Sequence, residues 1–163
     1  MRTLAHYATS PGEILGAMNQ RMLGRSQGGF TTCLVLRADT DGNLTIANAG
    51  HIAPYLAGDE LPIENGLPLG LTSETAYAES VFQLAPGKQL TLLTDGVVEA
   101  REKTGALFGF ERTAALSNQP AQAIAAAAQK FGQEDDITVL TLTRLGVAEA
   151  STAQNAAPIL SPA

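Results

Sequence analysis

The sequence predicts one α+β domain built as a sandwich, with strands grouped in antiparallel hairpins and helices grouped before and after them. The chain has 163 residues, which suits one domain, since domains average about 150 residues. Hydrophobic residues make up 45% and charged residues 16% of the chain, so there is ample material for a core. Strand patterns cluster between residues 30 and 94 instead of alternating with helices, which disfavours βαβ units.

The first helix is predicted to begin at Ser10 and to run to about residue 23. Ser10 fits the N-cap, Pro11 fits the first helical position, and Glu13 completes a capping box three residues after the cap. Apolar residues at positions 14, 15, 18, 22 and 23 form one stripe, which indicates one buried face. Residues 1–8 resemble the last turns of another helix.

Short β-rich runs follow in the middle of the chain. Residues 30–38 and 44–49 flank a polar turn and predict a β-hairpin. A third strand is expected at residues 52–57, before a loop rich in Pro and Gly. Residues 77–84 and 89–94 flank an Ala-Pro-Gly-Lys turn and predict a second hairpin.

Two helices and a strand complete the predicted domain. The helices are expected at residues 110–116 and 120–131, and the strand at residues 137–145. After residue 146 the composition is rich in Ala, Ser, Thr, Gln and Pro and has no Lys or Arg. We therefore expect a domain over residues 1–146 and a disordered tail over residues 147–163.

Composition also narrows the function classes. Ten basic residues against sixteen acidic ones give a net charge of −6, which argues against a nucleic-acid partner and suits metal cations or basic partners. Cys33 is the single cysteine, so an internal disulfide framework is excluded and a cytoplasmic location is expected. No apolar run reaches the ~18 residues that a membrane span requires.

Carboxylates mark the predicted site. Asp95-Gly96 ends one apolar strand pattern and Asp135-Asp136 precedes another, so adjacent antiparallel strands would bring these two ends together. Each pair alone is also typical of a simple turn or a solvated pair. Carboxylates grouped without His or Cys favour Mg²⁺ or Mn²⁺ and hence phosphoryl chemistry. A two-carboxylate glycoside hydrolase is disfavoured because the chain has no Trp and 5% aromatic residues.

Five sequence strings occur in the order in which they occur in bacterial stage II sporulation protein E-like phosphatases: FTTCL at 30–34, NAGH at 48–51, GLPLGL at 66–71, LLTDGVVEAR at 92–101 and DDITV at 135–139. The chain therefore resembles these metal-dependent (PPM-type) serine/threonine phosphatases. The resemblance implies a four-layer α-β-β-α sandwich with mostly antiparallel sheets.

The resemblance also implies roles for residues. Asp95 and Asp135 would be ligands of a two-metal Mn²⁺ or Mg²⁺ centre, with Asp136 as a weaker candidate and the Gly96 backbone beside the metals. The metals would activate a water that attacks a phosphoserine or phosphothreonine of a protein. His51 is either a general acid or, as we favour, a residue that holds a turn. Glu99 is more simply a solvated carboxylate, and Arg101 could contact phosphate or pair with Glu99.

By the same resemblance, the substrate would be a phosphorylated anti-sigma-factor antagonist, and a sensor or receiver domain would lie upstream. The sequence lacks the family's upstream Gly-Asp-Val-x-Gly-type motif, whose Asp bridges the metals, so the fold is expected to lack its first strand or strands. The sequence either starts late or belongs to a degenerate relative. A non-catalytic PPM-like binding module is therefore the alternative, and an unpaired sheet edge would favour a homodimer.

Overall fold

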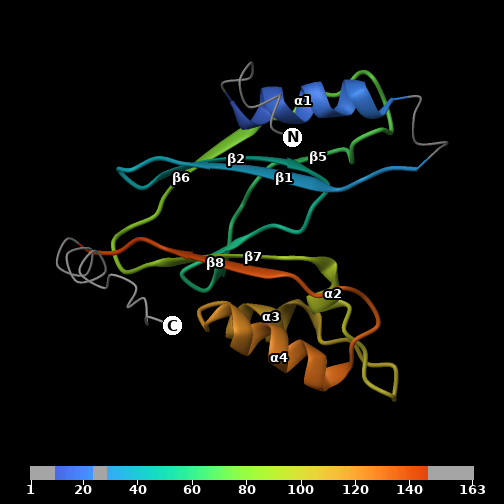
Figure 1. The fold of residues 1–163 in the computed structure, drawn as a ribbon, viewed down its shortest axis with the longest axis vertical. Coiled ribbons are helices and arrows are strands. Elements are labelled where there is room, and N and C mark those ends of the chain that lie inside the picture. Colours follow the sequence, from blue (N-terminus) through green and yellow to red (C-terminus); the bar gives the residue numbers. More distant parts are fainter. Residues whose placement is uncertain (1–9, 24–28, 147–163) are drawn as a thin grey trace, which may run out of the picture.

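Two β-sheets lie face to face, and helices cover their outer faces (Figure 1). The structure is a computed structural model, and it describes residues 10–23 and 29–146. From top to bottom in Figure 1 the layers are one helix, the first sheet, the second sheet and a group of helices. The predicted four-layer α-β-β-α sandwich is thus confirmed.

Helix α1 (Pro11–Met22) forms the top layer and begins as its sequence predicts. The Ser10 hydroxyl accepts a hydrogen bond from the Glu13 backbone N–H at 3.4 Å, and the Glu13 carboxylate accepts one from the Ser10 N–H at 3.3 Å. This capping box satisfies two N–H groups that the helix itself leaves without partners. Leu15 is buried against the first sheet, and the buried Asn19 donates to the Thr72 carbonyl at 2.8 Å, so α1 presents one face to the core.

The first sheet contains β1 (Cys33–Ala38), β2 (Asn43–Ala49), β5 (Asn65–Gly66) and β6 (Glu79–Gln83). Strand β2 is central: it pairs antiparallel with β1 and β6 and parallel with β5. Its side chains alternate between the two faces. Leu44 and Ile46 join the cluster between the sheets, while Ala47 and Ala49 face α1. This alternation follows from the period of two along a strand.

The second sheet is antiparallel throughout and has the strand order β4-β3-β7-β8. The strands are β3 (Tyr55–Leu56), β4 (Asp59–Glu60), β7 (Gln89–Leu93) and β8 (Val139–Thr143). Leu90 faces the first sheet, and Leu93 faces the helices below. Strand β7 therefore has apolar contacts on both faces and leads directly to Asp95.

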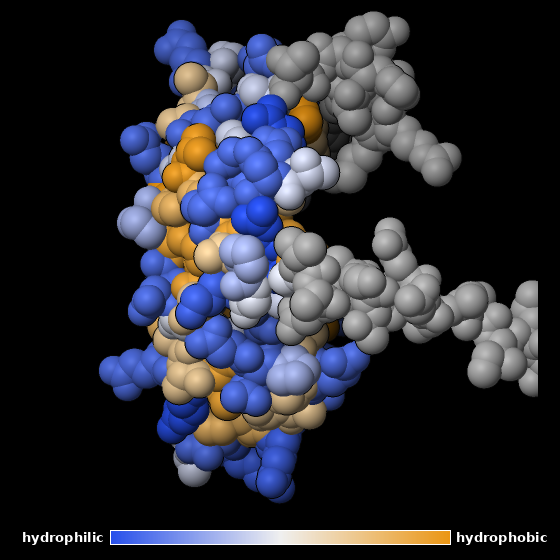
Figure 2. Space-filling view, turned by 90° about the vertical axis from the view of Figure 1, so that its left-hand side faces the viewer, coloured by the Kyte–Doolittle hydropathy of each residue, from blue (hydrophilic) through white to orange (hydrophobic). Residues whose placement is uncertain are grey.

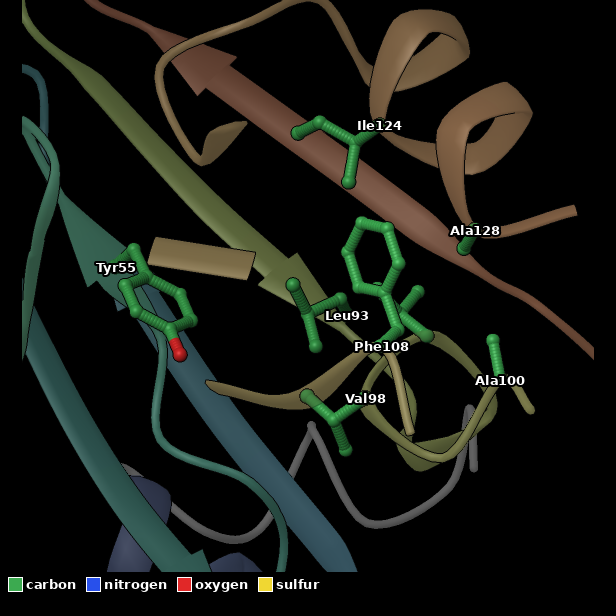
Figure 3. Packing of buried hydrophobic residues seen from close by; sticks show 8 residues of the cluster. Tyr55, Leu93, Val98, Ala100, Phe108, Ile124 and Ala128 are labelled. Carbon is green, nitrogen blue, oxygen red and sulfur yellow. The ribbon is translucent and has the colours of Figure 1, made fainter. Parts of the chain in front are cut away.

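The bottom layer contains α2 (Asp95–Val98), α3 (Gly109–Leu116) and α4 (Ala121–Gly132). Figure 3 shows the buried cluster that joins these helices to β7, with Phe108 between Leu93, Ile124 and Ala128. The rings of Phe108 and Phe131 meet edge to face, with centroids 5.5 Å apart. This packing anchors α2, whose first residue is the site carboxylate Asp95.

The surface is mostly hydrophilic on the side that Figure 2 shows, and hydrophobic residues reach it in patches near mid-height, at the level of the two sheets (Figures 1 and 2). No helix among residues 10–23 and 29–146 is long and apolar enough to cross a membrane.

The predicted second hairpin is wrong. The turn forms, since the Lys88 N–H donates to the Ala85 carbonyl at 3.0 Å, but β6 pairs with β2 while β7 pairs with β3 and β8. The chain therefore passes from one sheet to the other at this turn. Strand β6 pairs with one edge of the buried β2. After the turn, the Gly87 N–H donates to the Arg144 carbonyl at 2.7 Å, and this hydrogen bond ties the start of β7 to the end of β8.

Two other predicted strands are shorter than expected. The strand expected from residue 30 begins at Cys33, because Phe30 is 60% exposed and Thr31 forms only a single bridge to Leu69. The strand expected at residues 52–57 contains only β3, because the chain before it is held in a turn by Asn48.

The loop predicted after it contributes the short β5. Within the described part of the chain no strand precedes α1, while the helix expected at residues 1–8 and the tail expected at residues 147–163 lie outside the described residues.

Candidate functional site

Asp95 lies where β7 ends and α2 begins. Its side chain is exposed, and Oδ1 accepts a hydrogen bond from the Gly96 N–H at 3.0 Å. The other carboxylate oxygen, Oδ2, accepts no hydrogen bond from the described residues. The sequence predicts Asp95 at the end of a largely buried strand, and the structure confirms this position.

Asp135 and Asp136 lie in the loop between α4 and β8. Asp135 Oδ1 accepts a hydrogen bond from the Asp136 N–H at 2.7 Å, and the Gln133 amide donates to the Asp135 carbonyl at 3.0 Å. Both aspartates are exposed. Each carboxylate of the Asp95 and Asp135 pair is thus oriented by the N–H of the residue that follows it.

Thr94 ties the two loops together. Its N–H donates to the Thr138 carbonyl at 3.0 Å, and its hydroxyl accepts a hydrogen bond from the Thr138 N–H at 3.0 Å. The same hydroxyl donates to the Asp136 carbonyl at 3.2 Å. The backbone of Asp136 also lies so close to Gly96 that a side chain at position 96 would collide with it. The structure therefore brings Asp95-Gly96 and Asp135-Asp136 together, as the strand pattern predicts.

Arg101 supports this junction from the far side of α2. Its N–H donates to the Gly132 carbonyl at 2.8 Å, and its guanidinium lies 3.5 Å from a Glu134 carboxylate oxygen. Pairing of Arg101 with Glu99, one of the two roles considered for Arg101, is not found among the described residues, where Arg101 pairs with Glu134 instead. A side chain at Gly132 would meet the Arg101 carbonyl, and the φ of Gly132 is +150°, so this contact requires glycine.

A polar cavity of about 240 Å³ opens beside the junction. It is lined by Gly96, Glu99, Arg101, Glu134 and Asp135. Three carboxylates against one guanidinium make its wall acidic, which favours a bound cation over a bound anion. Glu99 thus lies at the cavity with its side chain exposed to solvent.

His51 lies on the other side of Asp95, where the two residues line a small cavity of about 70 Å³. The buried Asn48 accepts a hydrogen bond from the His51 N–H at 2.9 Å and donates to the His51 carbonyl at 2.8 Å. The ring nitrogen Nδ1 lies 2.9 Å from the Ile52 carbonyl. A carbonyl oxygen can only accept, so Nδ1 carries the proton of this hydrogen bond.

Cys33 does not belong to the site as a nucleophile. It is half-buried at the start of β1, and burial raises the pKa of its thiol. A raised pKa keeps the thiol protonated at neutral pH, which disfavours nucleophilic attack. The prediction that Cys33 is a small packing residue agrees with its contact with the cluster beneath α1.

The side chains of Asp95 and Asp135 carry the type of ligand atom that a hard divalent cation binds. Asp95 and Asp135 supply only oxygen donors, and Mg²⁺ is commonly held by one or two carboxylates together with waters and substrate phosphate. Among residues 10–23 and 29–146, no group of three or more His, Cys, Asp or Glu side chains is arranged to hold a metal. Asp95 and Asp135 could thus supply two of the oxygen ligands of such a cation, with water and phosphate as the others.

The aspartates could be predicted from the sequence, but the residues that fix the positions of their two loops could not. Thr94, Thr138 and Gly132 carry no titratable group, and their roles depend on which strands are neighbours. The first two do lie inside the strings LLTDGVVEAR and DDITV, where Thr94 directly precedes Asp95 and Thr138 is two residues after Asp136, and this placement was the available signal.

Comparisons with known proteins agree with the fold. The family model described as Stage II sporulation protein E (SpoIIE) matches residues 1–145. No match was found among curated proteins.

Solved structures are also similar. The RsbU and RsbW domains of Rv1364c from Mycobacterium tuberculosis align with 22% identity and a TM-score of 0.63, over 92% of this chain and 49% of that one. The SiaA-PP2C domain of Pseudomonas aeruginosa aligns with 26% identity and a TM-score of 0.68, over 82% of this chain and 61% of that one.

The phosphatase domain of SpoIIE from Bacillus subtilis aligns with 16% identity and a TM-score of 0.59, over 99% of this chain and 76% of that one. This chain thus spans about half of the first of these structures, 49%, and less than two thirds of the second, 61%.

Proposed function

Because this chain belongs to the stage II sporulation protein E (SpoIIE) family of PPM-type phosphatase domains, we propose that it is a metal-dependent protein phosphatase. Its substrate is a phosphoserine or phosphothreonine on a regulatory protein. The observation that carries the proposal is the junction at which Asp95-Gly96 meets Asp135-Asp136. Membership of this phosphatase family is the reason for assigning phosphoester hydrolysis to this junction.

Asp95 and Asp135 are the residues that would hold Mn²⁺ or Mg²⁺ in this proposal. Asp136 is a further carboxylate, and the Gly96 backbone lies beside both loops. When bound, such a cation lowers the pKa of a water and neutralises charge on the phosphate oxygens. In support, the similar phosphatase domain of SpoIIE from Bacillus subtilis is described as presoaked with Mn.

The residues of this chain supply orientation and access. The Gly96 N–H donates to one oxygen of Asp95, and the Asp136 N–H donates to one oxygen of Asp135. Each hydrogen bond fixes the orientation of its carboxylate and therefore also the position of the second oxygen. Because Asp95 and Asp135 are exposed, a phosphorylated side chain on the surface of another protein can reach them. Arg101 and Glu134 hold the Asp135 loop in place rather than acting on the phosphate.

His51 takes a structural role in this proposal. Its Nδ1–H is donated to the Ile52 carbonyl, and this hydrogen bond holds the imidazole ring in place. Its backbone is held by Asn48. His51 therefore shapes the wall next to Asp95.

The regulatory protein that we propose as substrate is a phosphorylated anti-sigma-factor antagonist, with a sensor or receiver domain acting upstream. The family supports this class of partner, and the open acidic site suits a phosphorylated loop that is delivered together with a cation.

A catalytically incomplete PPM-like binding module is the alternative function. It is favoured by the absence, within the described residues, of any acidic group of three or more that could hold a metal. The sequence also has no Gly-Asp-Val-x-Gly motif before residue 30. Such a module would bind a partner through the same surface without hydrolysing it.

Hydrolysis of a phosphoserine peptide with and without added Mn²⁺ separates these functions. We expect Mn²⁺-dependent release of phosphate by the wild-type chain, and a fall to the metal-free level for Asp95→Asn and for Asp135→Asn. Asp59→Asn removes an exposed carboxylate in β4 and should leave turnover unchanged. A folded wild-type protein that binds the peptide without releasing phosphate would instead support the binding module.

A further inference from the structure

The loop that follows β5 exposes two leucines. Leu67 is 52% exposed and Leu71 is 50% exposed, whereas Leu69 between them is fully buried. The stretch from residue 66 to residue 73 contains no charged residue. Single exposed leucines are common on soluble proteins, but exposed apolar residues that form a group mark a surface at which another molecule binds.

Phe30 adds a third large apolar residue to this group. It is 60% exposed and directly precedes Thr31. The Thr31 N–H donates to the Leu69 carbonyl at 3.1 Å, and the Leu69 N–H donates to the Thr31 carbonyl at 2.9 Å. These two hydrogen bonds form an antiparallel bridge between the two segments. Phe30, Leu67 and Leu71 therefore belong to two segments that are held together, and we refer to them as the apolar surface.

Asn19 of α1 fixes the shape of the loop. Its side chain is 1% exposed. The side-chain amide donates to the Thr72 carbonyl at 2.8 Å, and the side-chain oxygen accepts a hydrogen bond from the Gly70 N–H at 2.7 Å. These two partners lie directly before and after Leu71, so a buried polar side chain holds the backbone on both sides of this exposed leucine. A surface that is fixed before binding loses less conformational entropy when a partner docks on it.

The same loop lies against the turn that carries His51. A Cβ at Gly50 would come within 2.7 Å of the Pro68 ring, so the loop and the turn are in close contact. Gly50, His51 and Asp95 line one small cavity of about 70 Å³. Leu67 directly precedes Pro68, so the apolar surface is continuous with the wall of the candidate site next to Asp95.

We propose that Phe30, Leu67 and Leu71 bind apolar side chains that flank the phosphorylated residue of the substrate protein. This inference rests on the function proposed above, because the phosphate then lies at Asp95 and Asp135 while the neighbouring substrate residues lie on the apolar surface. The contact gives the phosphatase a preference for one class of sequence around the phosphoserine or phosphothreonine.

The distribution of charge around the site selects an apolar flanking sequence as the occupant. The cavity on the other side of Asp95 carries the carboxylates of Glu99 and Glu134, whereas residues 66–73 carry no charge. A charged substrate residue would lose hydration on the loop without gaining an opposite charge. An apolar substrate residue would instead remove its own apolar area and that of the exposed leucines from water.

Two phosphoserine peptides test the proposal. They differ only at the second and third positions on each side of the phosphoserine, where one peptide has leucine and the other has serine. For the wild-type chain we expect a KM about fivefold lower for the leucine peptide, less than the ~10-fold or more that an enclosed apolar pocket gives, because these leucines lie on an open surface. Leu67→Ser combined with Leu71→Ser should remove this preference. Val81→Ser, at a residue of β6 that is 66% exposed, is the matched control and should keep it.

Binding of the same peptides gives a readout that does not need turnover. Fluorescence anisotropy of the labelled peptides should show the same preference in affinity. Absence of hydrolysis therefore contradicts the proposed function, whereas absence of a preference contradicts the docking surface. Equal KM and equal affinity of the wild-type chain for the two peptides would overturn the proposal, as would a preference that survives the double leucine variant or that Val81→Ser removes.

Discussion

The carbonyl oxygen of Asp136 lies directly against Gly96, in the space that a side chain at position 96 would need. These residues are distant in sequence and belong to the loops that carry Asp95 and Asp135. Their contact sets how closely the two loops approach, since Gly96 is buried and cannot move outward without disturbing α2. The glycine of the Asp-Gly pair is therefore a packing requirement and not only a turn residue.

Substitution Gly96→Ala should separate the two loops. We expect a loss of about 1–3 kcal/mol in the free energy of unfolding, the usual cost of overpacking a buried position, and a weaker response to Mn²⁺. Urea denaturation measures the first effect. Gly16→Ala is the control: a Cβ at Gly16 has no neighbour within 4 Å, so this helix substitution should stabilise the protein by about 0.5–1 kcal/mol. Equal stability of Gly96→Ala and wild type would refute the packing argument.

Thr94→Val should loosen the Asp136 loop while keeping the shape of the side chain. The substitution removes the hydroxyl that bonds to the Asp136 carbonyl and to the Thr138 N–H. We expect a cost of about 1–2 kcal/mol and faster hydrogen exchange at the Thr138 amide. Thr94→Ser retains the hydroxyl and should restore slow exchange at Thr138. Unchanged exchange in Thr94→Val would show that the hydroxyl does not hold the loop.

Asn48→Ala should be more costly than His51→Ala. The buried Asn48 side chain bonds to the backbone of His51 on both sides and to Asn65. Its loss leaves buried polar groups without partners, for which we expect a cost of about 3 kcal/mol. His51→Ala retains those backbone bonds and should cost less. Thermal unfolding ranks the two variants, and the reverse order would assign the structural role to the imidazole instead.

Stability should fall in acid partly through Glu79. The hydrogen bond from the Ser10 side chain, followed by the one from the Gly12 N–H at 2.8 Å, lowers the pKa of Glu79 below its ordinary value of 4.5. A carboxylate with a lowered pKa in the folded state adds stability above pH 4.5, and this stability is lost as the pH falls through the folded-state pKa. Glu79→Gln should flatten that part of the curve of unfolding free energy against pH. An unchanged acid limb would contradict this role of Glu79.

Local signals in the sequence predicted the start of α1 and the position of Asp95 because both depend on neighbouring residues. The capping box of Ser10 and Glu13 and the apolar run before Asp95 are examples. The pairing of β6 with β2 could not be predicted, because a turn at residues 85–88 is compatible with a hairpin and with a passage between sheets. The pairing of Arg101 with Glu134 also could not be predicted, because Glu134 approaches Arg101 only after α4 packs on β7 and β8.

A calorimetric titration of Mn²⁺ into the folded protein tests the central claim most directly, namely that Asp95 and Asp135 form one metal site. The account predicts saturable binding to the wild-type chain that Asp95→Asn and Asp135→Asn each weaken strongly and that Asp59→Asn leaves intact. The double variant should bind no more weakly than the weaker single variant, since both carboxylates serve the same site. Absence of binding to the folded wild-type chain, or binding that neither substitution changes, would contradict the claim.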